Sequence, residues 1–170
     1  RPQCVDPVAR KGQGELQKDI ANLKGAMAKH GVDRGLIKED SPGVIALFLQ
    51  NAHYPTREAY LEALANAMRD EYRTILESGL DLQLDCPDLA LSRHMLFADL
   101  SDAEFLKIAA THVEALEHAL QGLPQDRIRL HICWGNYEGP HDFDIPLEKI
   151  MDIVLAAKPA TILFEHANPR

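Results

Sequence analysis

The spacing of hydrophobic residues along the chain predicts helices that alternate with short strands. In four segments, apolar side chains recur at steps of three or four residues, which is the period of an amphipathic helix. These segments are 14–30, 57–76, 105–120 and 147–155. Thr56 can cap the second helix, and Ser101 with Glu104 forms a capping box before the third.

Three shorter segments, 80–85, 128–133 and 161–165, alternate apolar with polar residues or are rich in β-branched residues, as strands are. The apolar segment 44–49 is short enough for a buried strand and equally suits the start of a helix. Strands that alternate with helices imply right-handed crossovers and a parallel sheet. We therefore expect an α/β fold.

The length of 170 residues suits one domain but falls short of an eight-stranded (βα) barrel, which takes roughly 250. The interpretation is a single domain, 1–170, that forms a partial TIM (βα) barrel. The chain begins without Met and stops just after a predicted strand, so it reads as the central part of a longer catalytic barrel.

Composition narrows the range of partners and compartments. A net charge of −8 disfavours binding to a phosphate backbone, so no nucleic-acid partner is expected. No apolar run approaches 18 residues and no signal peptide is visible, so no membrane partner is expected either. The three cysteines, at 4, 86 and 133, are a poor disulfide framework and favour a reducing, cytoplasmic location.

Each predicted strand ends in polar residues that share one face. Asp85 ends the first strand, His131 and Cys133 end the second, and Glu165 ends the third. In parallel βα folds the carboxyl ends of the strands gather the ligand-binding residues. Nitrogen, sulfur and oxygen donors with one open position suit a catalytic zinc ion. Strand-end polar residues also commonly hydrogen-bond to loops, so spacing alone leaves both interpretations open.

The same residues lie in segments that resemble the catalytic domain of the cobalamin-independent methionine synthase family, in particular its shorter stand-alone members. Segment 130–137, Leu-His-Ile-Cys-Trp-Gly-Asn-Tyr, is similar to the family's His-x-Cys-aromatic-x-Asn-aromatic segment. Segment 82–89 resembles its Gln-x-Asp-Glu-Pro-x-Leu strand end, and 162–165 its glutamate-bearing strand. Segment 41–44, Ser-Pro-Gly-Val, is similar to its Thr-Gly-Pro-Val turn.

The resemblance implies a methyltransferase. His131, Cys133 and Glu165 would bind Zn²⁺, Asp85 would hold the amino group of homocysteine, and Ser41 would be a second substrate-binding residue. The methyl donor would be methyltetrahydrofolate, with or without a polyglutamate tail, and methionine the product. By the same resemblance the fourth zinc ligand, a cysteine, and the histidine proton donor lie outside residues 1–170.

Two departures from the family leave alternatives. Cys86 stands where the family usually has Glu, and Leu49 falls near the position of a Trp that stacks on the folate. One alternative keeps the zinc-thiolate chemistry but uses another donor or another thiol, such as coenzyme M. The other is a non-catalytic half barrel that binds a partner or self-associates through open sheet edges.

Overall fold

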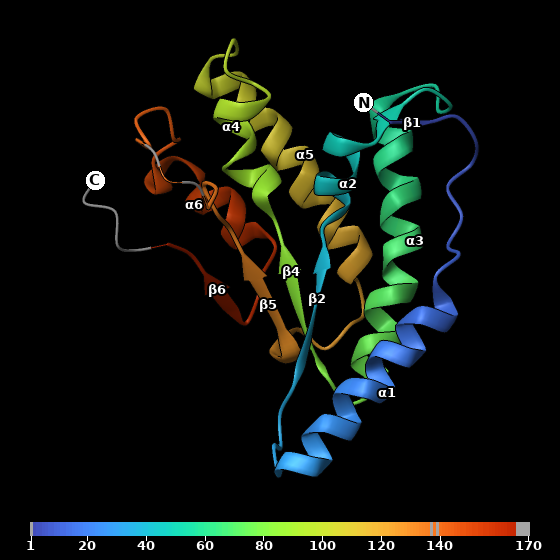
Figure 1. The fold of residues 1–170 in the computed structure, drawn as a ribbon. Helices are drawn as coiled ribbons and strands as arrows, with labels where there is room; N and C mark the ends of the chain where they lie inside the picture. The colour runs from blue at the N-terminus through green and yellow to red at the C-terminus, as the bar shows by residue number, and fades with distance from the viewer. Residues whose placement is uncertain (1, 137, 139, 166–170) are drawn as a thin grey trace.

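The computed structural model describes residues 2–136, 138 and 140–165. Its main sheet has four parallel strands in the order β2-β4-β5-β6, and Figure 1 shows them side by side. Their bounds are Leu36–Asp40, Asp81–Asp85, Ile128–His131 and Thr161–Leu163. Two short strands, β1 (Gln3–Cys4) and β3 (Gln50–Asn51), form a separate parallel pair. The predicted α/β class with parallel strands is confirmed. The four-stranded sheet is compatible with part of a barrel, and the barrel itself stays a prediction.

Long helices connect the strands, and shorter helical segments follow β2 and β4 or precede β5. The long ones are α1 (Gln13–His30), α3 (Arg57–Glu77), α5 (Asp102–Leu120) and α6 (Leu147–Ala156). The short ones are α2 (Pro42–Phe48), α4 (Ser92–Met95) and the 3-10 turns η1 (Pro87–Leu89) and η2 (Gln125–Arg127). Among the described helices, none is both long and apolar enough to cross a membrane.

Each long helix starts and stops where the sequence predicts. The Thr56 side chain accepts from the backbone N–H of Ala59 at the start of α3, and Ser101 and Glu104 form the predicted capping box of α5. Such caps satisfy backbone donors that the first helical turn leaves unpaired. Ser41 caps α2 in the same way, so the ambiguous segment 44–49 is mainly helical.

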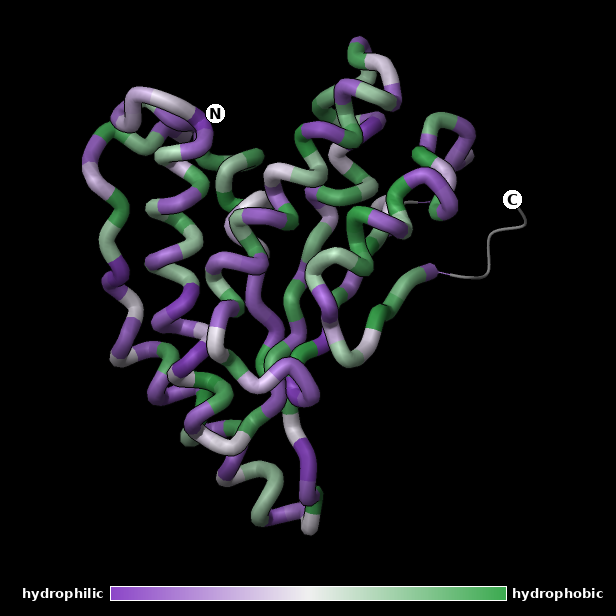
Figure 2. Tube along the Cα trace, turned by 180° about the vertical axis from the view of Figure 1, so that it is seen from behind, coloured by the Kyte–Doolittle hydropathy of each residue, from purple (hydrophilic) through white to green (hydrophobic). Residues whose placement is uncertain are grey.

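The helices cover one face of the sheet and leave the other open. Figure 1 looks onto the open face, with α5 and α6 behind the strands and α3 beside β2. From behind, the helices show hydrophilic and hydrophobic residues in alternation (Figure 2), as expected when each helix turns one apolar stripe toward the sheet.

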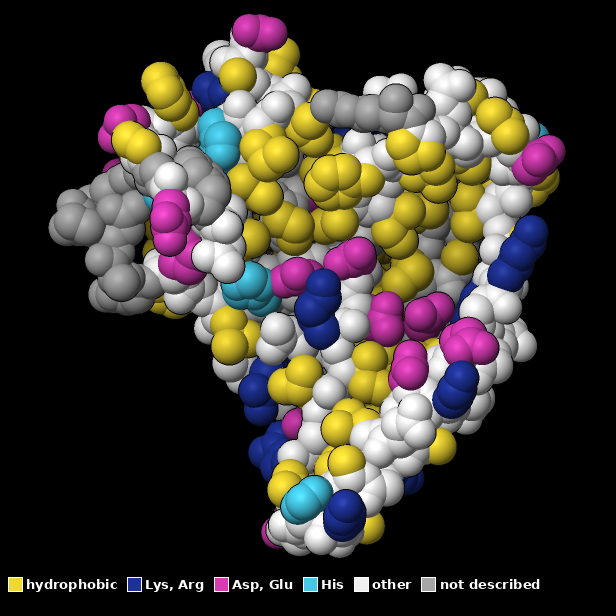
Figure 3. All heavy atoms as spheres, in the orientation of Figure 1, with side chains coloured by type: hydrophobic (Ala, Val, Ile, Leu, Met, Phe, Trp, Pro, Cys, Tyr) yellow, Lys and Arg dark blue, Asp and Glu magenta, His cyan; other side chains and the backbone are white. Residues whose placement is uncertain are grey.

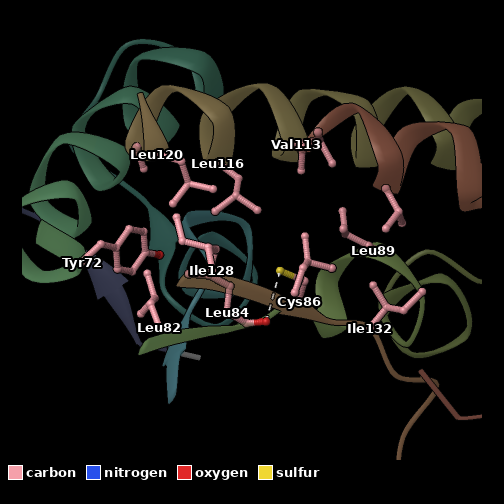
Figure 4. Close-up of a cluster of buried hydrophobic side chains, with 14 of the residues drawn as sticks. Tyr72, Leu82, Leu84, Cys86, Leu89, Val113, Leu116, Leu120, Ile128 and Ile132 are labelled. Carbon is pink, nitrogen blue, oxygen red and sulfur yellow. Dashed lines mark hydrogen bonds between the residues drawn. The ribbon is translucent and has the colours of Figure 1, made fainter. Parts of the chain in front are cut away.

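The hydrophobic core lies between the covered face of the sheet and helix α5. In Figure 4 the side chains of Val113, Leu116 and Leu120 of α5 approach those of β4 and β5. From the strands, Leu82, Leu84, Ile128, Leu130 and Ile132 are at most 1% exposed. This apolar set is the one that alternation placed opposite Asp85 and His131, so the predicted division of the strand faces is confirmed.

Two strand predictions differ from the structure. Residues 36–40 form strand β2, which the sequence pattern did not reveal because Lys38, Glu39 and Asp40 interrupt any alternation. The ladders of β5 and β6 stop two residues early, so Cys133 and Glu165 lie just beyond regular strand geometry.

A buried polar network joins α2, η1 and α5 above the sheet. Oγ of Ser41 donates to Oδ1 of Asp88 at 2.8 Å, and Nδ1 of His112 lies 2.9 Å from Oδ2 of the same carboxylate. All three residues are about 1% exposed. Gly43 is packed directly against this network, since a Cβ there would meet Oδ2 of Asp88 and lie 2.6 Å from Nδ1 of His112.

Replacing Gly43 by Ala should therefore destabilise the fold. The added methyl group must push Asp88 and His112 apart, at a cost of at least about 2 kcal/mol from overpacking and a lost buried hydrogen bond. Urea unfolding measures the effect. Gly25→Ala, on α1 with no atom within 4 Å of the added methyl, is the control and should stabilise by about 0.5–1 kcal/mol. Equal stability of Gly43→Ala and the native chain would contradict the packing described here.

Glu39 should make stability fall as the pH rises toward 8. Burial raises the pKa of Glu39 to about 7, and the charge of Glu71 on α3 adds to this. The side chain of Arg10 forms an ion pair with Glu71, in which Nε lies 3.4 Å from Oε2. Because the folded state holds this proton more tightly than the unfolded state, stability declines between pH 4.5 and 7.

The variant Glu39→Gln should consequently be more stable than the native chain at pH 8, with the difference vanishing near pH 5. Chemical denaturation at both pH values measures it. Glu62→Gln, at an exposed position of helix α3, is the control and should show no such trend. A Glu39→Gln advantage that persisted unchanged at pH 5 would point to a cause other than titration.

Candidate functional site

The parallel register brings the polar ends of the strands into one row. Asp40 lies opposite Asp85, Asp85 opposite His131, and His131 opposite Leu163. Their side chains lie on the open face of the sheet, because their neighbours in sequence point into the core. Figure 3 shows acidic, basic and histidine side chains gathered across the middle of this face, below a hydrophobic area.

Asp85 and His131 are joined directly. Nδ1 of His131 and Oδ1 of Asp85 form a short hydrogen bond, and Nζ of Lys38 lies 3.1 Å from Oδ2 of Asp85. Partial burial opposes ionisation of Asp85, but the hydrogen bonds from His131 and Lys38 outweigh it and lower the pKa of Asp85. At neutral pH Asp85 is therefore a carboxylate held between two donors.

This contact orients the imidazole of His131. With Nδ1 engaged by a carboxylate, Nε2 is the ring nitrogen left for a ligand, and 29% of the side chain is exposed. Histidines that bind metals almost always donate their second nitrogen to a carboxylate, a carbonyl or water, which fixes the ring. His131 thus has the second-nitrogen contact of a metal-binding histidine.

Cys133 is half-buried beside this pair. Its backbone carbonyl accepts from the N–H of Leu91 at 3.0 Å, which holds the end of β5 against the segment after β4. Burial raises the pKa of the Cys133 thiol, and the negative charges of Asp85 and Glu165 add to that rise while a hydrogen bond from Gly135 opposes it. Because its pKa is raised, this cysteine is a thiol at neutral pH as long as no cation binds to it.

Glu165 is exposed and follows β6 by two residues. Because Leu163 lies opposite His131, continuing the register would place Glu165 opposite Cys133. Its charge contributes to the raised pKa of the Cys133 thiol. Within the described part of the chain, however, no three His, Cys, Asp or Glu side chains are grouped closely enough to hold a metal ion. The ligand set His131, Cys133 and Glu165 stays a prediction.

Ser41 and Cys86 have neighbours that differ from those of the strand-end row. The hydroxyl of Ser41 is engaged on both sides, because it donates to Asp88 and accepts from the N–H of Val44 at 3.1 Å. The structure thus gives Ser41 a capping role, and its substrate-binding role stays a prediction. Cys86 is fully buried among core side chains (Figure 4), and burial raises the pKa of its thiol well above the ordinary value.

Sequence reasoning missed two participants near the strand ends. Lys38 escaped notice because its strand was not predicted, and a lysine in a charged segment carries no signal of its own. The Asp88–His112 pair joins residues 24 positions apart, and no local pattern relates them. Tyr137, the last residue of the segment 130–137 compared with the family, lies outside the described residues. Gly139 and residues 166–170 lie outside them too.

Comparison with known proteins gives one distant relative. The chain matches no protein-family profile. It is 31% identical over 97 residues to a methionine synthase of Pyrococcus abyssi (strain GE5 / Orsay). The match takes in 56% of this chain and 25% of that protein, so the chain spans about a quarter of its relative's length. The similarity suggests the methionine synthase family at a distant and partial level.

Asp85 should stabilise the fold only while it is ionised. Its pKa is lowered in the folded state, so its contribution is present above the ordinary value of about 4 and is lost as pH falls through the lowered value. Asp85→Asn should cost roughly 0.5–1 kcal/mol at pH 7, a figure discounted for solvent screening.

Urea unfolding from pH 7 to pH 3 measures how the difference between Asp85→Asn and the native chain changes. The difference should shrink toward the acid end. Asp99→Asn, at an exposed position, should match the native chain throughout. A constant difference for Asp85→Asn at every pH would show that lost charge is not the cause.

Proposed function

We propose that this chain is, or is part of, a zinc-dependent methyltransferase that moves a methyl group from a methylated folate to the thiol of homocysteine, forming methionine. The observation that carries the proposal is the Asp85–His131 hydrogen bond beside Cys133 at the carboxyl ends of β4 and β5. The distant similarity to a methionine synthase supports the same reaction class.

The donor set fits zinc chemically. Nε2 of His131, the thiolate of Cys133 and a carboxylate oxygen of Glu165 are the three donor types that zinc accepts in proteins. When bound, zinc lowers the pKa of a coordinated thiol and so keeps a nucleophilic thiolate available at neutral pH. This would reverse the rise that burial and the nearby carboxylates impose on Cys133.

The chain's own residues would orient His131 and bind the substrate. Asp85 fixes the ring of His131 through Nδ1, which leaves Nε2 as the ring nitrogen for a ligand. A carboxylate has about four lone-pair sites, so Asp85 can accept from His131 and Lys38 and still receive the amino group of homocysteine. Lys38 is exposed and lies 3.4 Å from Asp40, which adds a second carboxylate to the same row.

A second candidate keeps this chemistry but transfers an alkyl group from another donor or to another thiol. The observation that favours it is Leu49, whose partly buried side chain packs against the cluster of Cys4, Tyr60 and Leu64. This aliphatic side chain presents no aromatic surface at the position where the family stacks a folate on Trp. The donor is thus the part of the proposal that the sequence supports least.

The test measures zinc content and methyl transfer on the same samples of the full-length protein, because the resemblance places the fourth zinc ligand and the proton donor outside residues 1–170. Zinc by elemental analysis should be stoichiometric in the native protein and should be lost in Cys133→Ala, which removes a ligand. Cys86→Ala is the control, because Cys86 points into the core and should keep its zinc. Methyl transfer to homocysteine is assayed from methyltetrahydrofolate with mono- and polyglutamate tails, and should disappear with the zinc.

The outcomes separate the candidates. A folded native protein that binds no zinc would sink both enzyme proposals and favour a non-catalytic half barrel that binds a partner or a second copy. Stoichiometric zinc without transfer from either folate would rule out the methionine synthase reaction and leave alkyl transfer involving another donor or thiol.

A further inference from the structure

A cavity lies apart from the strand-end row. It is a cleft of about 370 Å³ formed by α2, β3, the start of α3 and the segment after α4. Its lining combines apolar and polar side chains: Ala46, Leu47, Gln50, Asn51, Arg57, Tyr60, Leu96 and Phe97. None of the residues discussed for zinc belongs to this lining. The volume falls within the usual range for small-molecule sites, which are mostly apolar with a few placed polar groups.

The guanidinium of Arg57 is the only cationic group in this lining. One of its terminal nitrogens, Nη2, lies 2.7 Å from Nε2 of His112. A guanidinium carries five N–H donors, and among the described residues this imidazole nitrogen is its one recorded acceptor. No carboxylate of the described residues comes within the 4.0 Å of an ion pair with it, and Arg57 is exposed, so its remaining donors can be reached by a ligand.

The imidazole fixes the guanidinium without neutralising it. Arg57 can only donate, so Nε2 of His112 accepts, and Nδ1 of the ring carries the proton that it donates to Asp88. The carboxylate of Asp88 is therefore separated from Arg57 by a neutral ring, and it is already shared with Ser41. Partial desolvation lowers the pKa of Arg57, while the charges of Glu58 and Asp88 act in the opposite direction.

We propose that this cleft binds a small organic anion, whose carboxylate or phosphate monoester pairs with Arg57 and whose apolar body lies against Leu47, Leu96 and Phe97. A planar guanidinium matches both anions with two parallel hydrogen bonds. The apolar side chains beside it suit an aromatic or aliphatic body and give no binding to a bare ion. The inference does not depend on zinc or on methyl transfer, so it stands or falls separately from the proposed function.

The experiment titrates the native chain with benzoate and phenyl phosphate, and with inorganic phosphate and benzyl alcohol as the half-ligands. Binding is followed by calorimetry and by the amide signals of residues 50, 51, 96 and 97. At least one of the two aromatic anions should bind saturably at millimolar concentration or below and move these signals. Each half-ligand should bind at least about tenfold more weakly than that anion, because benzyl alcohol lacks the charge-assisted hydrogen bonds and inorganic phosphate lacks the apolar body, and either loss is worth about that factor.

Matched variants test the two halves of the site. Arg57→Gln should weaken binding of the anion about tenfold or more, and Arg57→Lys should restore part of it. Arg73→Gln, at an exposed arginine of the same helix, is the charge control. Leu96→Ser should weaken binding of the aromatic body, while Met95→Ser, at a 54% exposed neighbour outside the lining, should not.

Several results would overturn the proposal. Absence of saturable binding by both aromatic anions would do so, as would unchanged binding in a folded Arg57→Gln variant. Inorganic phosphate that bound as tightly as phenyl phosphate would remove the apolar half, and benzyl alcohol that bound as tightly as benzoate would remove the charged half. Benzoate binding without phenyl phosphate, or the reverse, would support the proposal and identify the anion.

Discussion

The parallel pairing of β4 with β5 is the constraint on which the rest of the structure depends. It sets Asp85 opposite His131 and Leu84 opposite Leu130, so one register fixes both the polar row and the core. A slip by one residue would turn every side chain to the other face. The leucines under α5 and the Asp85–His131 hydrogen bond on the open face therefore favour the same alignment.

The sheet must also stay uncovered on one face for its polar row to be reached. Helices pack only against the apolar face, where their own apolar stripes are buried. Glu39 is the exception, because it belongs to a strand but lies on the helix-covered side near Glu71. Its raised pKa is the cost of placing a carboxyl group there. The apolar residues of the same strand, Leu36 and Ile37, are both only half-buried.

Local pattern was sufficient for most of the fold and for part of the site. Periodicity and capping residues predict the long helices, since these signals lie within a few residues of one another. Alternation predicts which side of β4 and β5 carries Asp85 and His131, but only the register reveals that the two touch. Strand β2 escaped prediction because three consecutive charged residues leave no alternation to read. The position of Glu165 relative to Cys133 depends on geometry beyond the ends of β5 and β6.

The four residues from Asp85 to Asp88 connect the polar row to the buried network. Asp85 turns to the open face and Cys86 to the core, and the turn η1 then carries Asp88 back to meet Ser41 and His112. The backbone reinforces this arrangement, because the N–H of Ser41 donates to the carbonyl of Asp85 at 3.1 Å and that of Cys86 to the carbonyl of His131 at 2.8 Å.

The position of the Asp85 carboxylate is consequently set from two sides. On the sheet, β2 and β5 hold its backbone in register; beyond the sheet, Asp88 ties the next turn to α2 and α5. A buried, fully paired network resists displacement, because breaking one contact leaves the others unsatisfied. The tight approach of Gly43 to Asp88 leaves no room for the turn to shift toward α2. Residues far from the open face thus hold His131 and Asp85 in the geometry on which any chemistry there depends.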